Sequence, residues 1–448
     1  MNLEGIRIMK LDVCNFAKIR TANIELNGIT VIAGNNNTGK TTVGKILFSI
    51  FNSIYDINGK IEDSRSREIY SRCRHSIRNV YLSNGIRKED GAITRSSMNR
   101  RVEVASRDFS RLLQNKQEFI NDANYVVELF TEVSEKNGLP INDEIKENFR
   151  QIINQEIDIV NNTEDYRIAL EIIERFFNNI FSNQVCNLTN SDSSKIKLNI
   201  HEQEIEFLFN DNRCVEWNNS IEIMHEAFLV DDPFLIDELG DIWGGFSYGG
   251  QATRDFLLRK IEASAYDEQE NVISSVLAKE KLKEIEQIIN NIVPEEVQRK
   301  NGEWVVASDS YRESIHVDNL SAGVKSFLLL KMLLERGILK EKDVLILDEP
   351  EIHLHPEWQI KYAEIIVLLQ KKFDLSILVT THSRDFFEAI ELYSKKYCIM
   401  DKCKFYLSKP IDNEVEFADV SDQISEIYKH LVDPSKLLDK IKFELEDE

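Results

Sequence analysis

The chain has 448 residues, of which 42% are hydrophobic, and its 55 Lys and Arg residues against 77 Asp and Glu residues give a net charge of −22. This length accommodates two or three domains, or one core with large insertions. The acidic balance argues against a protein coated uniformly in nucleic acid, and no apolar run is long enough for a membrane span. The N-terminus lacks a secretion signal and the 6 cysteines form no C-x-x-C pair, so we predict a cytoplasmic protein with no membrane partner.

The first 60 residues read as strands that lead into a glycine-rich loop. Residues 8–16 alternate like a strand, and residues 23–32 read as two strands around Asn27-Gly28, which predicts a β-hairpin. The second strand runs into Gly34-Asn-Asn-Asn-Thr-Gly-Lys-Thr, and residues 42–54 follow as a helix with one apolar face. We assign residues 1–60 to the N-terminal part of the lobe that carries this loop.

This loop matches the phosphate-binding pattern G-x-x-x-x-G-K-[ST] at every fixed position. Concentrated negative charge on a triphosphate requires backbone N–H groups, a helix N-terminus and one point cation, and Lys40 supplies the cation. The Thr41 hydroxyl suits a magnesium ion. The nucleotide-binding residues predicted here are Gly34, Asn35, Asn36, Asn37, Thr38, Gly39, Lys40, Thr41 and Thr42.

Residues 61–189 have a helical pattern without strand pairs, and we interpret them as an insertion. Its stretch from Arg65 to Arg111 carries twelve Lys and Arg residues against five Asp and Glu residues, with Tyr70 and Tyr81 interleaved. Three readings stay open: a solvated helical face, contact with DNA or RNA, and docking of an acidic partner.

The rest of the chain returns to strands and then to an α/β pattern. Residues 190–265 are β-rich, 266–302 hold an amphipathic helix at 268–292, 303–410 alternate strand and helix, and 411–448 form an acidic tail. At about 38 Å the amphipathic helix is too short for the arm of a chromosome-organising ATPase. The predicted fold is therefore α/β, a P-loop NTPase head with a mixed or antiparallel β subdomain and a helical insertion.

Two carboxylates end an apolar strand near residue 348. Asp348 suits the magnesium shell, and Glu349 suits activation of an attacking water. The next predicted strand ends at His382, which should face the same crevice and sense the γ-phosphate. Ser321 and Gly323 open a helix just before the carboxylate strand, where a signature loop would complete a neighbour's nucleotide site.

His353 and His355 have the spacing of some metal ligands, but no further Cys or His cluster accompanies them. Pro356 stands where a helix would start. We favour a connecting loop at a dimer interface over a metal centre.

These motifs make the chain resemble the ABC-type ATPases of the RecF, SMC and OLD group. The segments that match are Asn15-Phe16, Gly34–Thr42, Leu320–Gly323, Leu347–Pro356 and Thr380–His382. The continuation Glu-x-His-Leu-His-Pro at 351–356 resembles the bacterial branch that contains OLD nucleases and the ATPase subunits of the anti-phage systems Septu, PARIS and retron-linked modules. The resemblance covers the ATPase lobes, and residues 60–185 carry no motif that we recognise.

The resemblance implies an ATPase that uses ATP and Mg²⁺ and forms a homodimer or higher oligomer, with Ser321 of one copy facing Lys40 of another. It further implies a bacterial defence subunit that controls a separately encoded, nuclease-like effector and senses nucleic acid or a phage protein through Arg65–Arg111. A RecF-like or SMC-like DNA repair ATPase is the alternative, and a transporter motor is disfavoured. Two features depart from the family pattern: the Q-loop has only Gln251 or Asp231-Asp232-Pro233 as candidates, and we expect no nuclease domain after Leu407.

Overall fold

The computed structural model describes residues 9–83, 95–114, 121–187, 189, 192–201, 203–219, 222–239, 252–264, 282–293, 296–300, 303–307, 312–431 and 444. The chain divides into two compact units. One unit comprises Met1–Tyr55 and Ile173–Glu448, and the other comprises Asp56–Ile172. The last residues of the predicted insertion at 61–189, from Ile173 onward, therefore belong to the first unit.

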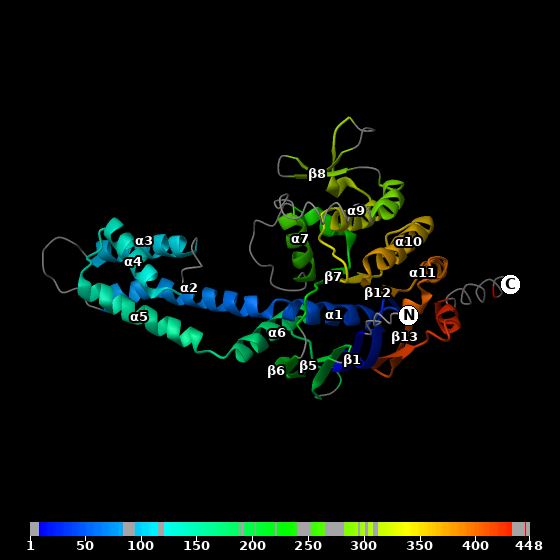
Figure 1. Ribbon diagram of the computed structural model, residues 1–448, viewed down its shortest axis with the longest axis horizontal. Helices are drawn as coiled ribbons and strands as arrows, with labels where there is room; N and C mark the ends of the chain where they lie inside the picture. The colour runs from blue at the N-terminus through cyan, green and yellow to red at the C-terminus, as the bar shows by residue number, and fades with distance from the viewer. Residues whose placement is uncertain are drawn as a thin grey trace, which may run out of the picture. The chain divides into compact units, whose positions relative to one another are not determined.

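The first unit is built on a mixed sheet of 11 strands (Figure 1). From one edge to the other its strands are β6 (Arg213–Asn219), β5 (Gln203–Asn210), β4 (Ser194–Ile200), β1 (Met9–Phe16), β2 (Ile19–Leu26), β14 (Glu414–Asp419), β13 (Cys403–Ile411), β3 (Ile29–Ala33), β12 (Ser376–Thr381), β11 (Val344–Asp348) and β7 (Ala227–Val230). The sheet confirms the predicted α/β fold class.

The half of the sheet from β13 to β7 is parallel throughout. Its strand β7 is a fully buried run of apolar residues, and β3 is also fully buried and apolar except for Thr30, as expected of strands covered on both faces. The carboxyl ends of β3, β12, β11 and β7 therefore meet at one edge. The half from β6 to β2 is antiparallel, and β1 and β4 alternate buried with more exposed residues.

The hairpin predicted around Asn27-Gly28 is wrong, although both of its strands exist. β2 pairs with β1 and β14, whereas β3 pairs with β12 and β13. Gly28 has a φ of 78°, and a Cβ added to it would lie 2.6 Å from the carbonyl oxygen of Lys402. Glycine at this position thus lets the backbone pass close to the segment before β13. Strands β13 and β14 lie between β2 and β3 in the sheet.

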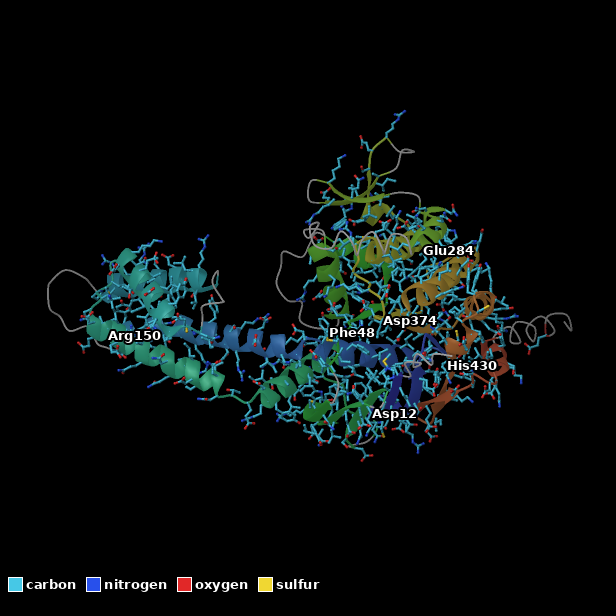
Figure 2. All side chains as sticks on the ribbon, viewed as in Figure 1. Asp12, Phe48, Arg150, Glu284, Asp374 and His430 are labelled. Carbon is cyan, nitrogen blue, oxygen red and sulfur yellow. The ribbon has the colours of Figure 1, made fainter. Side chains whose placement is uncertain are left out.

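Helices cover the parallel half of the sheet and connect its strands. They are α1 (Lys40–Ile54), α7 (Ala252–Ser264), α9 (Ala322–Glu335), α10 (Pro356–Phe373) and α11 (Arg384–Lys396), with α6 (Asp165–Phe181) spanning the boundary between the units and short 3₁₀ turns η2 (Pro233–Glu238), η3 (Val317–Asn319) and η4 (Met400–Lys402). α10 and α11 pack against each other (Figure 1). Phe48 of α1 (Figure 2) is fully buried. Its ring is tilted against that of Phe176 and lies edge-on to that of Phe256.

A second sheet of 3 strands has the order β10 (Ile315–His316), β9 (Glu303–Ala307) and β8 (Glu296–Lys300). The amphipathic helix predicted at 268–292 is described from residue 282 onward; residues 282–290 are helical, residues 291–292 form a turn, and the earlier part lies outside the described residues. Leu282, Ile285 and Ile289 of that segment belong to the main core of the first unit.

The second unit is helical, as predicted. It contains α2 (Ile57–Ser83), α3 (Arg95–Gln114), α4 (Ala123–Lys136) and α5 (Asp143–Asn161). α2 packs against α3 and α5, and α4 packs against the same two helices. Buried aromatic residues join the helices, with the rings of Phe130 and Phe149 stacked at 3.8 Å between centroids.

Candidate functional site

The glycine-rich loop leaves the carboxyl end of β3 and turns directly into α1. Gly39 is the N-cap residue of α1 and has a φ of 71°, a left-handed conformation that favours glycine. Gly34 has a φ of 153°, and a Cβ there would lie 1.9 Å from Ser408 Oγ on β13. Ser408 also shares a 2.6 Å hydrogen bond with Thr38. The sequence therefore uses glycine where the loop passes against a neighbouring strand.

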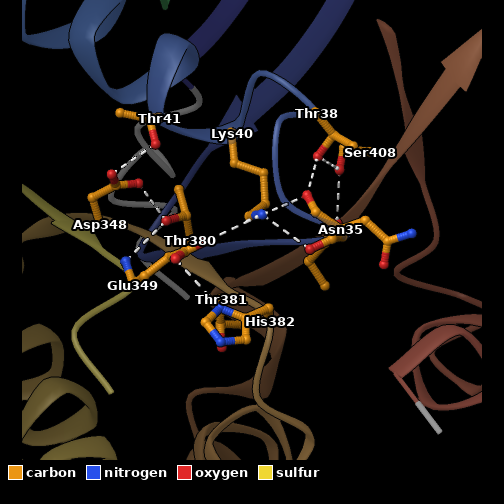
Figure 3. Close-up of polar contacts among 12 residues, drawn as sticks. Asn35, Thr38, Lys40, Thr41, Asp348, Glu349, Thr380, Thr381, His382 and Ser408 are labelled. Carbon is orange, nitrogen blue, oxygen red and sulfur yellow. Dashed lines mark hydrogen bonds and ion pairs between the residues drawn. The ribbon is translucent and has the colours of Figure 1, made fainter. Parts of the chain in front are cut away.

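Lys40 points into this loop and to the carboxylate strand (Figure 3). Its Nζ donates to the carbonyl oxygens of Gly34 at 2.9 Å and Asn35 at 2.8 Å, and it lies 3.2 Å from Glu349 Oε1. Only 4% of its side chain is exposed. Asn35, Asn36 and Asn37 are exposed at the tip of the loop. A buried ammonium held by carbonyls and one carboxylate is placed to exchange these partners for phosphate oxygens.

Asp348 ends β11 and is held by two hydroxyl groups. Thr41 Oγ1 donates to one carboxylate oxygen at 2.7 Å, and Thr380 Oγ1 donates to the other at 2.6 Å. The structure therefore brings together the two residues predicted for magnesium. A carboxylate and a threonine hydroxyl are hard oxygen ligands of the kind that Mg²⁺ prefers, so the donor set fits the ion. The sequence did not reveal the role of Thr380.

Glu349 follows Asp348 in a left-handed conformation, with a φ of 47°. Its backbone N–H donates to Thr380 Oγ1 at 3.0 Å. This uncommon conformation places the side chain between Lys40 and His382, whose Nδ1 lies 3.3 Å from Glu349 Oε2 (Figure 3). The predicted catalytic residues Glu349 and His382 thus lie in direct contact, with the imidazole 42% exposed.

Glu351 opens the 351–356 segment of the resemblance but was given no role from the sequence; in the structure it ties the loop after β11 to the loop after β12. Its Oε1 accepts from Thr381 Oγ1 at 2.5 Å, from the His382 N–H at 3.1 Å and from the Ser383 N–H at 3.3 Å. The residue is 1% exposed, and burial raises the pKa of its carboxyl group. Glu351 therefore positions the backbone of His382.

Ser321 caps α9 as predicted, because its Oγ accepts from the Val324 N–H at 3.4 Å. Gly323 packs closely against the first turn of α10 and the segment before it, since a Cβ there would lie 3.0 Å from the Trp358 ring and 3.2 Å from the His353 carbonyl oxygen. No described hydrogen bond joins Ser321 or Gly323 to residues 34–42. α10 begins at Pro356, as predicted.

The Q-loop candidates have different outcomes. Gln251 lies outside the described residues. Asp231 follows β7, and the pairing of Val230 with Leu347 puts Asp231 level with Asp348. Asp232 caps η2 through the Phe234 N–H at 2.8 Å and is ion-paired with Arg254. The segment Asp231-Asp232-Pro233 is therefore the candidate that reaches the edge of the sheet where the other site residues gather.

Some arginines of the basic stretch from Arg65 to Arg111 form ion pairs or hydrogen bonds within the second unit. Arg65 pairs with Asp165 at 2.6 Å, Arg72 pairs with Glu68 and Glu156 at 2.7 Å each, and Arg101 donates to the Gly138 carbonyl oxygen at 2.8 Å. Exposed arginines without a described ion pair are Arg67, Arg78, Arg100, Arg107 and Arg111. Arg87 and Lys88 lie outside the described residues, as do the side chains of Arg74 and Arg95.

The two interleaved tyrosines do not form a stacking platform. Tyr81 is 4% exposed and donates to the Pro140 carbonyl oxygen at 3.1 Å, while Tyr70 packs against the core of the second unit. His353 and His355 are exposed, and no group of three metal-ligating side chains occurs among the residues that the structure describes. No described helix is long and apolar enough to cross a membrane.

Taken together, the phosphate-type loop after β3 and the carboxylates after β11 are the features of a P-loop ATPase. The model of the AAA ATPase domain family matches residues 7–387, and the chain belongs to this family.

Among curated relatives, the ATP-binding protein Uup of Buchnera aphidicola subsp. Acyrthosiphon pisum is 35% identical over 119 residues. That match covers 26% of this chain and 18% of the relative, so the chain spans less than a fifth of the protein that it matches. The solved SMC head domain from Thermotoga maritima aligns with 92% of this chain and 99% of its own length, at 10% identity and a TM-score of 0.38.

Proposed function

We propose that the chain is an ABC-type ATPase that binds ATP with Mg²⁺ at residues 34–42 and converts ATP and water to ADP and phosphate. The observation that carries the proposal is the contact chain from Lys40 through Glu349 to His382, with distances of 3.2 and 3.3 Å. Phosphoryl transfer requires a cation on the phosphates, here Lys40, a group that orients water, here Glu349, and a donor near the γ-phosphate, here His382. This chain supplies one side chain for each requirement.

The residues present fit the nucleotide and the metal ion. Thr41 and Asp348, 2.7 Å apart, would hold Mg²⁺, and Lys40 with the N–H groups of residues 34–42 would hold the phosphates. The ion supplies charge neutralisation on the phosphates. Glu349 would orient and deprotonate water once Lys40 leaves it, and His382, fixed through its backbone by Glu351, would donate toward the γ-phosphate.

We further propose that two copies complete each site. Ser321 is exposed at the N-terminus of α9, where helix N–H groups favour an anion, and Gly323 fixes this end against Trp358. In a head-to-tail pair, Ser321 of one copy would face the phosphates held by Lys40 of the other. Two ATP molecules would then be enclosed between the copies.

A mixing experiment tests this arrangement. Lys40→Ala removes the phosphate cation, and Ser321→Arg blocks the signature end, so each variant alone should be inactive. Mixed copies contain one site with both wild-type halves, so phosphate release should return to a fraction of the wild-type rate. A mixture as inactive as its components would contradict two independently acting composite sites.

At the biological level, we propose a sensor and scaffold subunit of a bacterial anti-phage system that controls a separately encoded, nuclease-like effector. The segment 351–356 supports this, because it carries the Glu-x-His-Leu-His-Pro pattern and because its Glu351 is built into the catalytic loop rather than lying free. Phage plaque counts on cells that carry the chain with its neighbouring genes test the proposal. Protection that survives Glu349→Gln or deletion of every neighbouring gene would contradict it.

A DNA repair or maintenance ATPase remains the second candidate, favoured by the exposed Arg67 and Arg78 on α2. These two arginines are eleven residues apart and therefore share a helix face. Duplex DNA binding by the isolated chain that weakens steeply between about 50 and 200 mM salt would favour this candidate. An anionic trigger of a defence system would use the same face.

A further inference from the structure

The second unit carries opposite charges on two neighbouring helices. On α3, the core residues include Val102, Ala105 and Phe109. The exposed residues Arg100, Arg107 and Arg111 lie at intervals of seven and four residues, which places them in one stripe on the side of α3 opposite this core. None of the three has an ion pair or hydrogen-bond partner within the described part of the chain.

α4 carries the complementary stripe. Glu128, Glu132 and Glu135 are exposed at intervals of four and three residues, opposite the buried Phe130 and Val133. These carboxylates also lack a described ion pair; the acid–base contact between the two helices is instead formed by Lys136 of α4 with Asp108 of α3, at 3.7 Å. Thus α3 carries three unpaired arginines, with the exposed Glu103 between two of them, and α4 carries three unpaired glutamates, on helices that pack side by side.

The contacts between α3 and α4 fix the relative height of the stripes. Asp108 meets Lys136 and accepts from Asn137 Nδ2 at 3.3 Å, whereas Arg101, two turns earlier, reaches the Gly138 carbonyl oxygen at 2.8 Å. The helices therefore run antiparallel. At this register Arg107 is close to the height of Glu135, and Arg111 is close to the height of Glu132.

We propose that this surface, the α3/α4 face, is a docking site for the same face of a second copy of the chain. A two-fold axis parallel to the helices would lay α3 of each copy over α4 of the other. Such a rotation does not change the position of any residue along the helix axes. Arg107 then meets Glu135 of the partner subunit, Arg111 meets Glu132 of the partner subunit, and symmetry repeats both pairs. The face is self-complementary because its two stripes are adjacent, opposite in sign and level.

Nucleic acid fits the face less well. A duplex that approached the arginines of α3 would also bring its phosphates toward the glutamates of α4. The aromatic residue that could stack on bases, Tyr81, is buried. A second copy satisfies both stripes together. This contact needs no ATP, so it would hold two copies together before the proposed nucleotide sandwich closes and would raise the effective concentration of one ATPase lobe near the other.

Exposed ion pairs are individually weak and screened by salt, so the contact should be a salt-sensitive dimer. Reversing two charges on each copy would turn four attractive pairs into repulsive ones, and we expect the dissociation constant of the nucleotide-free dimer to rise by about thirty-fold or more. The arginine variant is Arg107→Glu with Arg111→Glu. The glutamate variant is Glu132→Arg with Glu135→Arg.

Sedimentation velocity of the full chain without nucleotide, at about 50 mM and about 1 M salt, tests the proposal. Wild type should dimerise at the lower salt only, and each double variant alone should be monomeric. An equal mixture of the two variants should form a heterodimer, and a chain with all four reversals should dimerise again, which separates lost charge pairing from misfolding. Arg67→Glu with Arg78→Glu on α2 is the matched control and should leave the dimer intact.

A monomeric wild type at low salt, double variants that dimerise like wild type, or a mixture and a fourfold variant that both stay monomeric would each overturn the proposal. A different set of results would assign the face to nucleic acid instead. Duplex DNA would bind wild type, would not bind the arginine variant and would bind the glutamate variant more tightly, and the mixture would contain no heterodimer.

Discussion

Glu349→Gln should uncouple nucleotide binding from hydrolysis, because Glu349 has two separate contacts in the site. Its Oε1 holds the Lys40 ammonium at 3.2 Å, and its Oε2 meets His382 at 3.3 Å. The amide keeps the shape of the side chain but loses its charge and its ability to accept a proton from water. Asp348 and Thr41 are untouched by the change.

The two effects have different magnitudes. Loss of a general base typically lowers turnover by about 10²- to 10⁴-fold, which corresponds to about 3–5 kcal/mol. Nucleotide binding must separate Lys40 from Glu349, and a hydrogen bond to a charged group contributes about 1.5–3 kcal/mol. Since Gln retains part of that hydrogen bond, we expect ATP affinity to rise by roughly tenfold, at the lower end of this range.

Equilibrium titration with a fluorescent ATP analogue measures the affinity, and single-turnover phosphate release measures the chemical step. Glu216→Gln, an exposed change of the same chemistry on β6, is the matched control and should alter neither quantity. Hydrolysis by Glu349→Gln at the wild-type rate would refute the assignment of the base. Weaker binding than wild type would refute the competition between Glu349 and ATP for Lys40.

Three further predictions address positioning, pH dependence and the loop. Glu351→Ala should lower turnover more than ATP affinity, because Glu351 fixes the His382 backbone; equal losses in both would point to general disruption of the site. Burial raises the pKa of Asp343 from 3.8 to about 6, so the free energy of unfolding should fall as pH rises from about 4 to about 6, where the unfolded chain has already released the proton that the folded chain retains. Asp343→Asn should remove that fall in denaturant titrations, and an unchanged pH dependence would contradict the cause. Gly34→Ala should lower the melting temperature and abolish ATP binding through the 1.9 Å approach to Ser408, and Ser408→Gly should partly restore both, whereas no rescue would exclude this clash as the cause.

The sequence predicted local elements well because local residues determine them. The strand pattern of residues 23–32 predicted β3, the apolar run before the two carboxylates predicted β11, and Ser321 predicted the start of α9. The parallel edge then explains why the motif residues meet, since consecutive strands of such a sheet bring their carboxyl ends together.

Long-range pairing was not predictable in the same way. Asn27-Gly28 has the composition of a hairpin turn, but β13 and β14, almost 400 residues later, lie between its two strands. Glu351 belongs to the 351–356 segment that carries the resemblance, but the sequence assigned it no contact, and only the folded chain shows three donors around one of its oxygens. The basic stretch was visible in the sequence, whereas the internal pairing of Arg65 and Arg72 depends on helices that meet in space.

The central claim is that ATP is hydrolysed in a site completed by a second copy. Phosphate release measured over a wide range of protein concentrations, at saturating ATP and Mg²⁺, tests it most directly. The account predicts that activity per chain rises with protein concentration and then levels off, and that Lys40→Ala stays inactive throughout. Activity per chain that is constant down to concentrations at which sedimentation shows only monomers would contradict it, as would wild-type turnover by Lys40→Ala.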